Sequence, residues 1–207
     1  EKFFDSALKK DFINSFLNLT LDSNLQYLIR EELVNAKLDF NTAGSAAILM
    51  NVQNGEILSL ISLPDYDLNQ RIEISDSTYS NKITLGVYEL GSVFKTFTIA
   101  AALENKILKP NTKFKNLKSN LTCDKYTISE HDKLPKDLTV EQILVRSSNI
   151  GAVRIAQKIG IEKYKNFLNS LELLESINFD LEEIGTPLPF KWGKCKLATT
   201  SYGHGIT

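Results

Sequence analysis

The sequence is poor in the side chains that most often bind metals. It has two cysteines and two histidines in 207 residues. Cys123 and Cys195 lie far apart and match no metal-ligand spacing. His131 and His204 do not cluster with them. A metal site is therefore not predicted. Two distant cysteines also do not establish a disulfide, which would need an oxidising compartment, so we expect two unrelated thiols.

A strong excess of charge is also missing. The formal net charge is −1 at pH 7, and no basic cluster stands out. Because nucleic acids and anionic membranes are bound by concentrated positive charge, neither partner is expected. Apolar residues at 43% and charged residues at 24% are ordinary for a globular protein with one sizeable core.

Long apolar runs are absent as well. No run approaches the roughly 20 residues that cross a bilayer as a helix, and no signal peptide is visible. The chain begins at Glu1 and not at a methionine. We therefore expect that a preceding segment has been removed.

The sequence does contain a serine and a lysine at the start of a strongly helix-forming segment. Ser92 and Lys95 come directly before residues 98–104, which have the composition of a buried helix. Ser92 would lie at a helix N-terminus, where free N–H groups favour a developing negative charge. The i, i+3 spacing places the Lys95 amine beside the Ser92 hydroxyl. An apolar surround from Val93, Phe94 and Phe97 would disfavour the ammonium form, so Ser92 is a candidate nucleophile and Lys95 its base.

A second polar group follows in Ser147-Ser148-Asn149. Ser147 and Asn149 would point the same way from a short loop at the head of another helix. The hydroxyl could relay a proton to a leaving group, and the amide could hold a substrate carbonyl and the lysine amine. The alternative for the first motif is structural, with Ser92 as a helix cap and Lys95 as a surface lysine.

The two motifs together resemble the first two active-site motifs of the penicillin-binding protein transpeptidase domain, of the class B, cell-division or elongation type. The likeness extends through residues 47–60 and 198–206 and covers the chain from Leu19 to its end. It implies an α+β fold with an antiparallel sheet flanked by helices. Residues 1–18 would be a connector or the end of an upstream domain, and residues 19–207 the transpeptidase domain.

The third motif of that family, Lys-Thr-Gly or Lys-Ser-Gly on a sheet strand, does not occur in the sequence. We therefore expect the domain to be truncated on its C-terminal side and its fold to be incomplete. The resemblance also implies a location on the outer, periplasmic side of the cytoplasmic membrane. The anchor would be an N-terminal helix that this chain does not contain.

The resemblance implies a peptidoglycan D,D-transpeptidase. It would form an acyl-serine intermediate from D-Ala-D-Ala stem peptides and crosslink them, with Ser92, Lys95, Ser147 and Asn149 as catalytic residues. Ser147 and Asn149 would also bind substrate. No cofactor or metal is implied. The expected partners are stem peptides, β-lactams that acylate Ser92, and membrane proteins of the divisome or elongasome.

Two alternatives stay open. The first is a non-catalytic, transpeptidase-like scaffold of a cell-wall assembly complex. The second is a serine β-lactamase or D,D-carboxypeptidase. A class A β-lactamase would carry Glu-x-x-Leu-Asn after the second motif, whereas here Lys165 stands at the position of the glutamate before Leu168-Asn169. Because the third motif is missing, we expect the isolated 207-residue chain to be poorly active.

Local patterns predict the remaining elements. Glu89 is predicted to be a loop or capping residue, and His204 to lie in a structural turn. The first predicted elements are a helix from Ser23 to Ala36, with a capping box at Ser23 and Gln26, and a hairpin of residues 45–51 and 56–63 around Asn54-Gly55. A helix follows Ser92, and segment 111–137 is predicted to be irregular. A capping box at Thr139 and Gln142 begins a short helix, and two further helices are predicted over 150–158 and 162–174.

Overall fold

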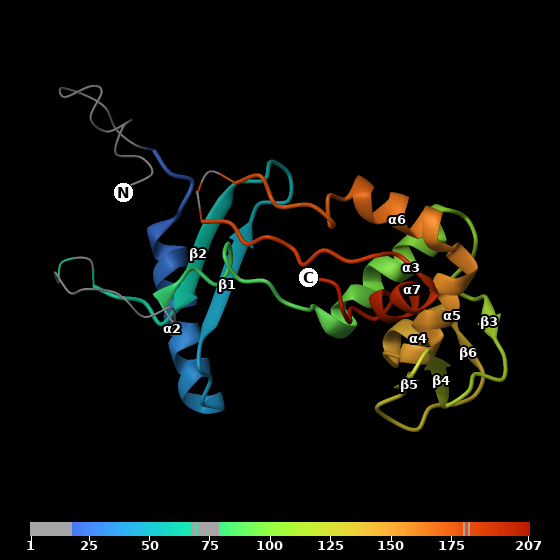
Figure 1. The fold of residues 1–207 in the computed structure, drawn as a ribbon. Helices are drawn as coiled ribbons and strands as arrows, with labels where there is room; N and C mark the ends of the chain where they lie inside the picture. The colour runs from blue at the N-terminus through green and yellow to red at the C-terminus, as the bar shows by residue number, and fades with distance from the viewer. Residues whose placement is uncertain (1–17, 68, 70–78, 180, 182) are drawn as a thin grey trace. The chain divides into compact units, whose positions relative to one another are not determined.

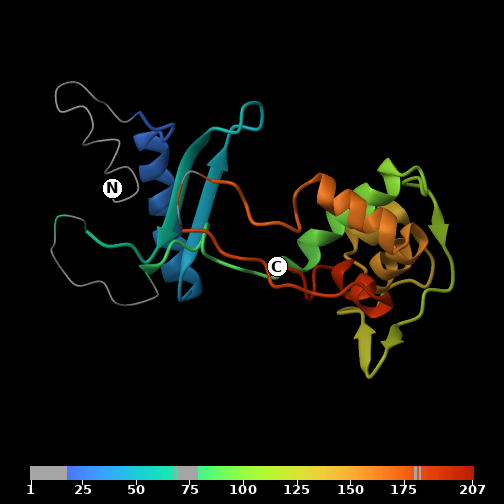
Figure 2. The ribbon, with the colours of Figure 1, turned by 45° about the horizontal axis from the view of Figure 1, so that its top comes forward.

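The computed structural model describes residues 18–67, 69, 79–179, 181 and 183–207. It divides into two compact units (Figures 1 and 2). Unit 1 contains the chain up to Gly86 together with Asn178–Gly185, and unit 2 contains Val87–Ile177 and Thr186–Thr207. Residues 1–17 lie outside the described residues, so the boundary placed at residue 18 stays a prediction.

Unit 1 consists of helix α2 (Ser23–Phe40) and an antiparallel pair of strands, β1 (Ser45–Met50) and β2 (Ile57–Leu63). The predicted hairpin is thereby confirmed. Figure 1 shows α2 lying along this pair of strands. Gln26 joins the two layers, because its Oε1 accepts hydrogen bonds from Ser59 Oγ at 2.6 Å and from Leu60 N at 2.7 Å.

The capping box predicted at Ser23 is wrong. Asp22 is the N-cap of α2, and its Oδ1 accepts hydrogen bonds from the N–H groups of Asn24 and Leu25. The Gln26 side chain, which would complete a capping box, is held by β2 instead. The helix continues beyond the predicted end to Phe40 and is followed by Asn41 in the left-handed conformation, with φ at 49°.

Unit 1 buries few side chains. No residue of α2 is buried. Along β2, Ser59, Ile61 and Leu63 are buried, at the alternate positions that face one side of a strand. The apolar side chains of α2 are at most half-buried, and its Leu28 is 58% exposed. One helix against two strands therefore covers one face of the pair and leaves apolar side chains of β1 exposed.

Unit 2 is a helical core built around α5 (Asn149–Ile159). It contacts α3 (Lys95–Glu104), α4 (Val140–Val145), α6 (Ile161–Ser170) and α7 (Lys194–Thr200). Figure 2 shows these helices gathered together. A buried hydrogen bond of 2.6 Å joins Thr98 of α3 to Tyr164 of α6, and Thr98 also donates to the carbonyl of Ser201 after α7.

The predicted start of one helix in unit 2 is confirmed, whereas the helix predicted over 162–174 ends at Ser170. Thr139 caps α4 in a capping box, in which its hydroxyl accepts from Gln142 N and the Gln142 side chain accepts from Thr139 N. Gly160 ends α5 with φ at 80°, and α6 begins at the next residue. Within the described ranges, no helix has the length and hydropathy of a membrane span.

Segment 111–137 was predicted to be irregular, but it contains short strands. Strand β3 (Lys113–Phe114) pairs with β6 (Leu138–Thr139), and β4 (Asn120–Cys123) pairs with β5 (Tyr126–Ser129) in a tight hairpin. These strands are only two or four residues long, which is too short for a clear alternating pattern in the sequence.

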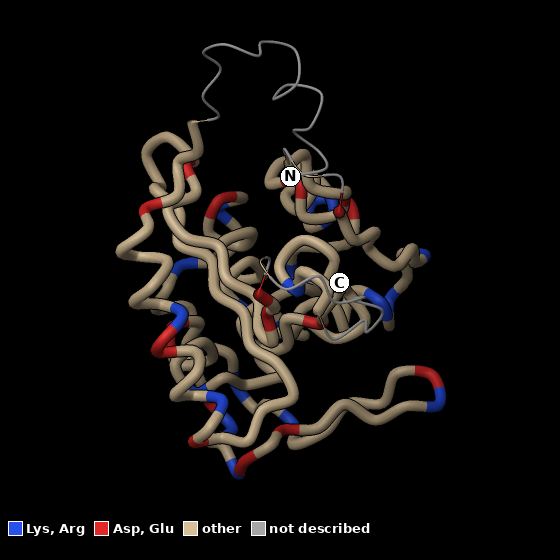
Figure 3. Tube along the Cα trace, turned by 90° about the vertical axis from the view of Figure 1, so that its left-hand side faces the viewer, with Lys and Arg blue, Asp and Glu red and all other residues tan. Residues whose placement is uncertain are grey.

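The expectation of two unrelated thiols is wrong as well. Cys123 at the end of β4 forms a disulfide with Cys195 of α7, and their Cα atoms lie 5.4 Å apart. The β4–β5 hairpin is thus covalently tied to α7. Across the described trace, Lys and Arg are interspersed with Asp and Glu (Figure 3).

Candidate active site

Ser92 and Lys95 meet at the junction of two helical segments. Ser92 lies in the 3₁₀ turn η2 (Gly91–Phe94), and Lys95 is the first residue of α3. Side chains three residues apart eclipse each other in a 3₁₀ turn. The Lys95 Nζ accordingly lies 3.0 Å from the Ser92 Oγ.

The Lys95 side chain is fully buried, at 0% exposure. Burial lowers the pKa of its amine to about 8, against a smaller opposing effect of Glu130. Of the predicted apolar surround, Phe94 is buried, whereas Val93 is 66% exposed and does not shield the amine. A substantial fraction of Lys95 is therefore the free amine near pH 8, which an exposed lysine would not provide.

Ser147 lies on the other side of the same amine. The Lys95 Nζ donates to the Ser147 carbonyl at 2.6 Å and to the Ser147 Oγ at 2.9 Å. Ser147 has φ at 52°, a left-handed conformation that serine rarely adopts. Ser92 and Ser147 are both exposed, so one buried amine links two accessible hydroxyls.

Asn149 is the first residue of α5, and its amide is directed to the β4–β5 hairpin. Its Nδ2 donates to the carbonyl of Ser129 at 2.9 Å. Its Oδ1 is buried and has no hydrogen-bond partner among the described residues. Of the four predicted site residues, the structure therefore brings Ser92, Lys95 and Ser147 into direct contact and places Asn149 beside them without a bond to the lysine.

Comparison with known proteins assigns the chain to a family. The family described as the penicillin binding protein transpeptidase domain matches residues 45–207. The chain belongs to this family. The probable peptidoglycan D,D-transpeptidase FtsI of Caulobacter vibrioides is 31% identical over 189 residues, which are 91% of this chain and 32% of that protein. Stage V sporulation protein D of Bacillus subtilis is 29% identical over 207 residues, which are 92% of this chain and 30% of that protein. The chain thus spans about a third of the length of these relatives.

Solved structures agree with the family assignment. The crystal structure of a peptidoglycan glycosyltransferase from Burkholderia ambifaria matches with a TM-score of 0.79 and 29% identity, over 91% of this chain and 56% of that one. The apo structure of the TP domain of penicillin-binding protein 3 from Burkholderia pseudomallei matches with a TM-score of 0.78 and 28% identity, over 91% and 53%. The predicted α+β fold is confirmed, and so is the resemblance to the class B type.

Two residues of this transpeptidase domain were not predicted as part of the site. Ser148 is buried and caps α5, because its hydroxyl accepts from Gly151 N at 2.8 Å. Its position before an apolar helix was a capping signal that the sequence did offer. Glu130 follows β5 and accepts hydrogen bonds at the same helix end. No local pattern marked it, since its partners lie far along the chain.

The turn 203–205 supports the loop before Ser92. Glu89 accepts from Gly205 N at 2.7 Å and lies 2.9 Å from His204 Nδ1. Gly203 has φ at 79°, and a Cβ there would overlap the carbonyl of Gly91. The structural turn predicted around His204 is present, and Glu89 is the loop residue that contacts it. Among the described residues, no three His, Cys, Asp or Glu side chains gather so that they could hold a metal ion.

Proposed function

We propose that the protein to which this chain belongs is a peptidoglycan D,D-transpeptidase. The observation that carries the proposal is the buried Lys95 amine, which contacts the hydroxyls of both Ser92 and Ser147. A base and two exposed hydroxyls in one hydrogen-bonded group are what acyl transfer without a histidine requires. The relatives named as peptidoglycan D,D-transpeptidases supply the substrate class.

The first half of the reaction is acylation. Lys95 as the free amine takes the proton of Ser92, and the Ser92 Oγ attacks the carbonyl between the last two D-alanines of a stem peptide. The backbone N–H of Ser92 stabilises the oxyanion that forms. Ser147 passes a proton to the nitrogen of the departing D-alanine, the C–N bond breaks, and the acyl group stays on Ser92. Asn149 orients the donor peptide.

The second half is transfer of the acyl group. An amine of a neighbouring stem peptide attacks the acyl-serine and loses a proton through the same relay. The Ser92 oxygen leaves and regains its hydrogen, so that one peptide crosslink forms for each D-alanine released. β-Lactams acylate the same Ser92, because their strained amide takes the place of the scissile peptide bond.

The surroundings of the reaction are also part of the proposal. Stem peptides lie outside the cytoplasmic membrane, so the protein would be held there by an N-terminal helix, together with membrane proteins of the divisome or elongasome. The disulfide between Cys123 and Cys195 supports an oxidising, extracytoplasmic compartment.

The test is covalent labelling of the full-length protein with a fluorescent penicillin, followed by intact-mass analysis. We expect one adduct that is lost in Ser92→Ala and kept in Ser170→Ala, a matched control in which an exposed serine at the end of α6 is changed. A long adduct lifetime excludes a β-lactamase and is the result expected of a transpeptidase, and rapid loss identifies a β-lactamase. If the folded protein forms no adduct, the proposal is wrong and the scaffold alternative takes its place.

A further inference from the structure

The carboxylate of Glu130 accepts three hydrogen bonds at the N-terminus of α5. Its Oε1 accepts from the Ser148 hydroxyl at 2.6 Å and from Ile150 N at 3.1 Å, and its Oε2 accepts from Asn149 N at 2.7 Å. These donors are the first groups of α5, where unpaired N–H groups and the helix dipole favour a negative charge. The carboxylate therefore fixes the three residues that follow Ser147.

Ser147 needs such support. A serine with a positive φ is held there by its neighbours and not by its own preference. On its N-terminal side, the backbone N–H of Ser147 itself donates to the carbonyl of Leu144 at 3.0 Å. On the other side, Glu130 binds the Ser148 hydroxyl and the next two N–H groups. If Glu130 were removed, the Ser147 hydroxyl would lose the anchor that keeps it 2.9 Å from Lys95.

Glu130 also acts on Lys95 through its charge. Among the described residues, the hydrogen-bond partners of the Lys95 amine are uncharged, namely the Ser92 hydroxyl from η2 and the hydroxyl and carbonyl of Ser147. From α6, the hydroxyl of Tyr164 reaches α3 at Thr98, and burial raises its pKa so that it stays neutral. Glu130 is the charged group whose field raises the pKa of Lys95 against the effect of burial. Its carboxylate thus favours the ammonium form.

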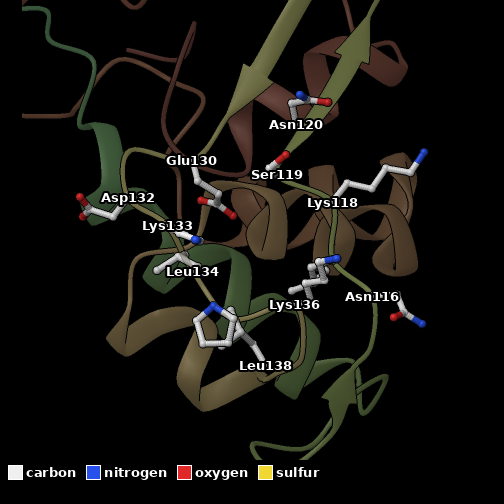
Figure 4. A pocket seen from close by; sticks show the side chains of 12 residues that line it. Asn116, Lys118, Ser119, Asn120, Glu130, Asp132, Lys133, Leu134, Lys136 and Leu138 are labelled. Carbon is white, nitrogen blue, oxygen red and sulfur yellow. The ribbon is translucent and has the colours of Figure 1, made fainter.

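Glu130 is itself held in place, and it lies outside the hydrogen-bonded group of Ser92, Lys95 and Ser147. The β4–β5 hairpin that leads to Glu130 is joined to α7 by the disulfide of Cys123 and Cys195. Figure 4 shows Glu130 among the residues that line a hollow of about 500 Å³, which is bordered by segments 116–120 and 130–138. Ser92, Lys95 and Ser147 are not among them. Glu130 therefore lies outside the hydrogen-bonded group of Ser92, Lys95 and Ser147, and it acts on this group through the first residues of α5 and through its charge.

We propose that Glu130 is a positioning residue for the acyl transfer. Through the N-terminus of α5 it holds Ser147 and Asn149 in place, and its charge stabilises the proton that Lys95 takes from Ser92. This inference rests on the proposed function, and it adds a residue that no contact with substrate would identify.

The test compares Glu130→Gln with Asp132→Asn in the full-length protein. Asp132 lines the same hollow and is exposed, so it is a matched control for the loss of a carboxylate. The rate constant for acylation by a penicillin is measured from pH 5 to pH 10. For Glu130→Gln we expect a fall in the plateau rate of up to about 100-fold, from misplaced Ser147, and a shift of the rising limb to lower pH. For Asp132→Asn we expect neither change.

The direction of the pH shift separates the proposed role from a purely structural one. Lys95 acts as the free amine, so the rate rises with pH through its pKa, and removing the negative charge of Glu130 lowers that pKa. A slower reaction with an unmoved midpoint would make Glu130 a helix cap only and would overturn the proposal. Wild-type rate and midpoint in Glu130→Gln would overturn it too.

A second measurement does not depend on acylation. The Lys95 amine is titrated by NMR in protein labelled with ¹³C-lysine, with Lys95→Met to assign its signal. A lower midpoint in Glu130→Gln than in the wild type supports the coupling between the two residues, and equal midpoints overturn it. If the two midpoints differ but the wild type is not labelled by penicillin, the proposed function is wrong, while the electrostatic coupling of Glu130 to Lys95 is supported.

Discussion

The two units of the molecule differ sharply in how they bury their side chains. Among the described residues, the buried apolar side chains of unit 1 are Ile61 and Leu63, and all the others belong to unit 2. Unit 1 instead exposes large apolar side chains on α2 and β1. The candidate active site lies in the unit that has a packed core, because a buried lysine and a strained serine both need rigid surroundings.

The difference in burial between the two units also shows that an apolar composition alone does not decide whether side chains are buried. The strands of unit 1 are as apolar as the helices of unit 2, but only one face of β2 is buried. Apolar composition predicts a strand or a helix, while the partner surface decides whether its side chains are buried. Four sets of substitutions test the difference between the two units, and they are given in order of decreasing expected effect.

The largest effect is expected at Lys95, where a substitution should slow penicillin labelling strongly and change the stability little. Lys95→Met removes the base and should lower the rate of penicillin acylation about 10²–10⁴-fold. Its stability should change by less than about 1 kcal/mol, since removing a buried amine also removes the cost of burying it. Labelling kinetics and urea unfolding measure the two quantities. Lys163→Met, an exposed change on α6, should alter neither, and a labelling rate in Lys95→Met near that of the wild type would contradict the assignment of Lys95 as the base.

The second test compares isoleucines in the two units. Ile155 of α5 has 0% exposure, and Ile48 of β1 is 45% exposed. Ile155→Ala should destabilise the protein by about 2–5 kcal/mol, and Ile48→Ala by less than about 1 kcal/mol. Chemical denaturation of both variants checks this. Equal losses would mean that β1 is buried in the protein in solution, and the contrast between the units would fail.

The third test concerns the disulfide of unit 2. Its cysteines are separated by 72 positions, and a crosslink that closes a long loop restricts the unfolded chain. Replacing both Cys123 and Cys195 by serine should lower the free energy of unfolding by about 2–4 kcal/mol. Urea unfolding with and without a reductant provides the measurement. The reductant should destabilise the wild type and leave the double variant unchanged, and a wild type insensitive to reductant would argue against the bond.

The smallest effect separates two glycines with the same backbone conformation. Gly203 has φ at +79° and faces the backbone of Gly91, while Gly55 has φ at +80° and has no atom near its missing Cβ. Gly203→Ala should cost about 1–3 kcal/mol and slow labelling of Ser92, because the loop before the serine must move. Gly55→Ala should cost about 1 kcal/mol and leave labelling intact. Labelling of Gly203→Ala at the wild-type rate would show that the turn 203–205 does not position Ser92.

The sequence predicted the features that depend on neighbouring residues. Asn54-Gly55 marked the hairpin, Thr139 and Gln142 marked a capped helix, and the spacing of Ser92 and Lys95 placed their side chains together. Each of these signals acts within a few positions, where backbone geometry alone decides which groups meet. The predicted capping box at Ser23 failed because Asp22, one residue earlier, offered a better acceptor.

The features that were missed join distant parts of the chain. The disulfide of Cys123 and Cys195 and the contacts of Glu130 with α5 span many residues, and neither has a local pattern. The amide of Asn149 was expected beside the lysine, but the β4–β5 hairpin, which was not predicted, binds it through Ser129. The sequence therefore indicated the candidate site residues, and the tertiary structure was needed to find which contacts hold them in place.

The position of the disulfide along the chain also has a mechanical consequence. Tension applied at the two ends of this chain would pass from Cys123 to Cys195 through the S–S bond and bypass residues 124–194. Ser147 and Asn149 lie inside that closed ring, whereas Ser92 and Lys95 lie outside it, on the stretch that carries the load. Pulling would therefore place tension on the proposed nucleophile Ser92 and the proposed base Lys95, while the loop that contains Ser147 and Asn149 would carry none. A single-molecule extension curve should be longer by the contour of the ring only after the bond is reduced.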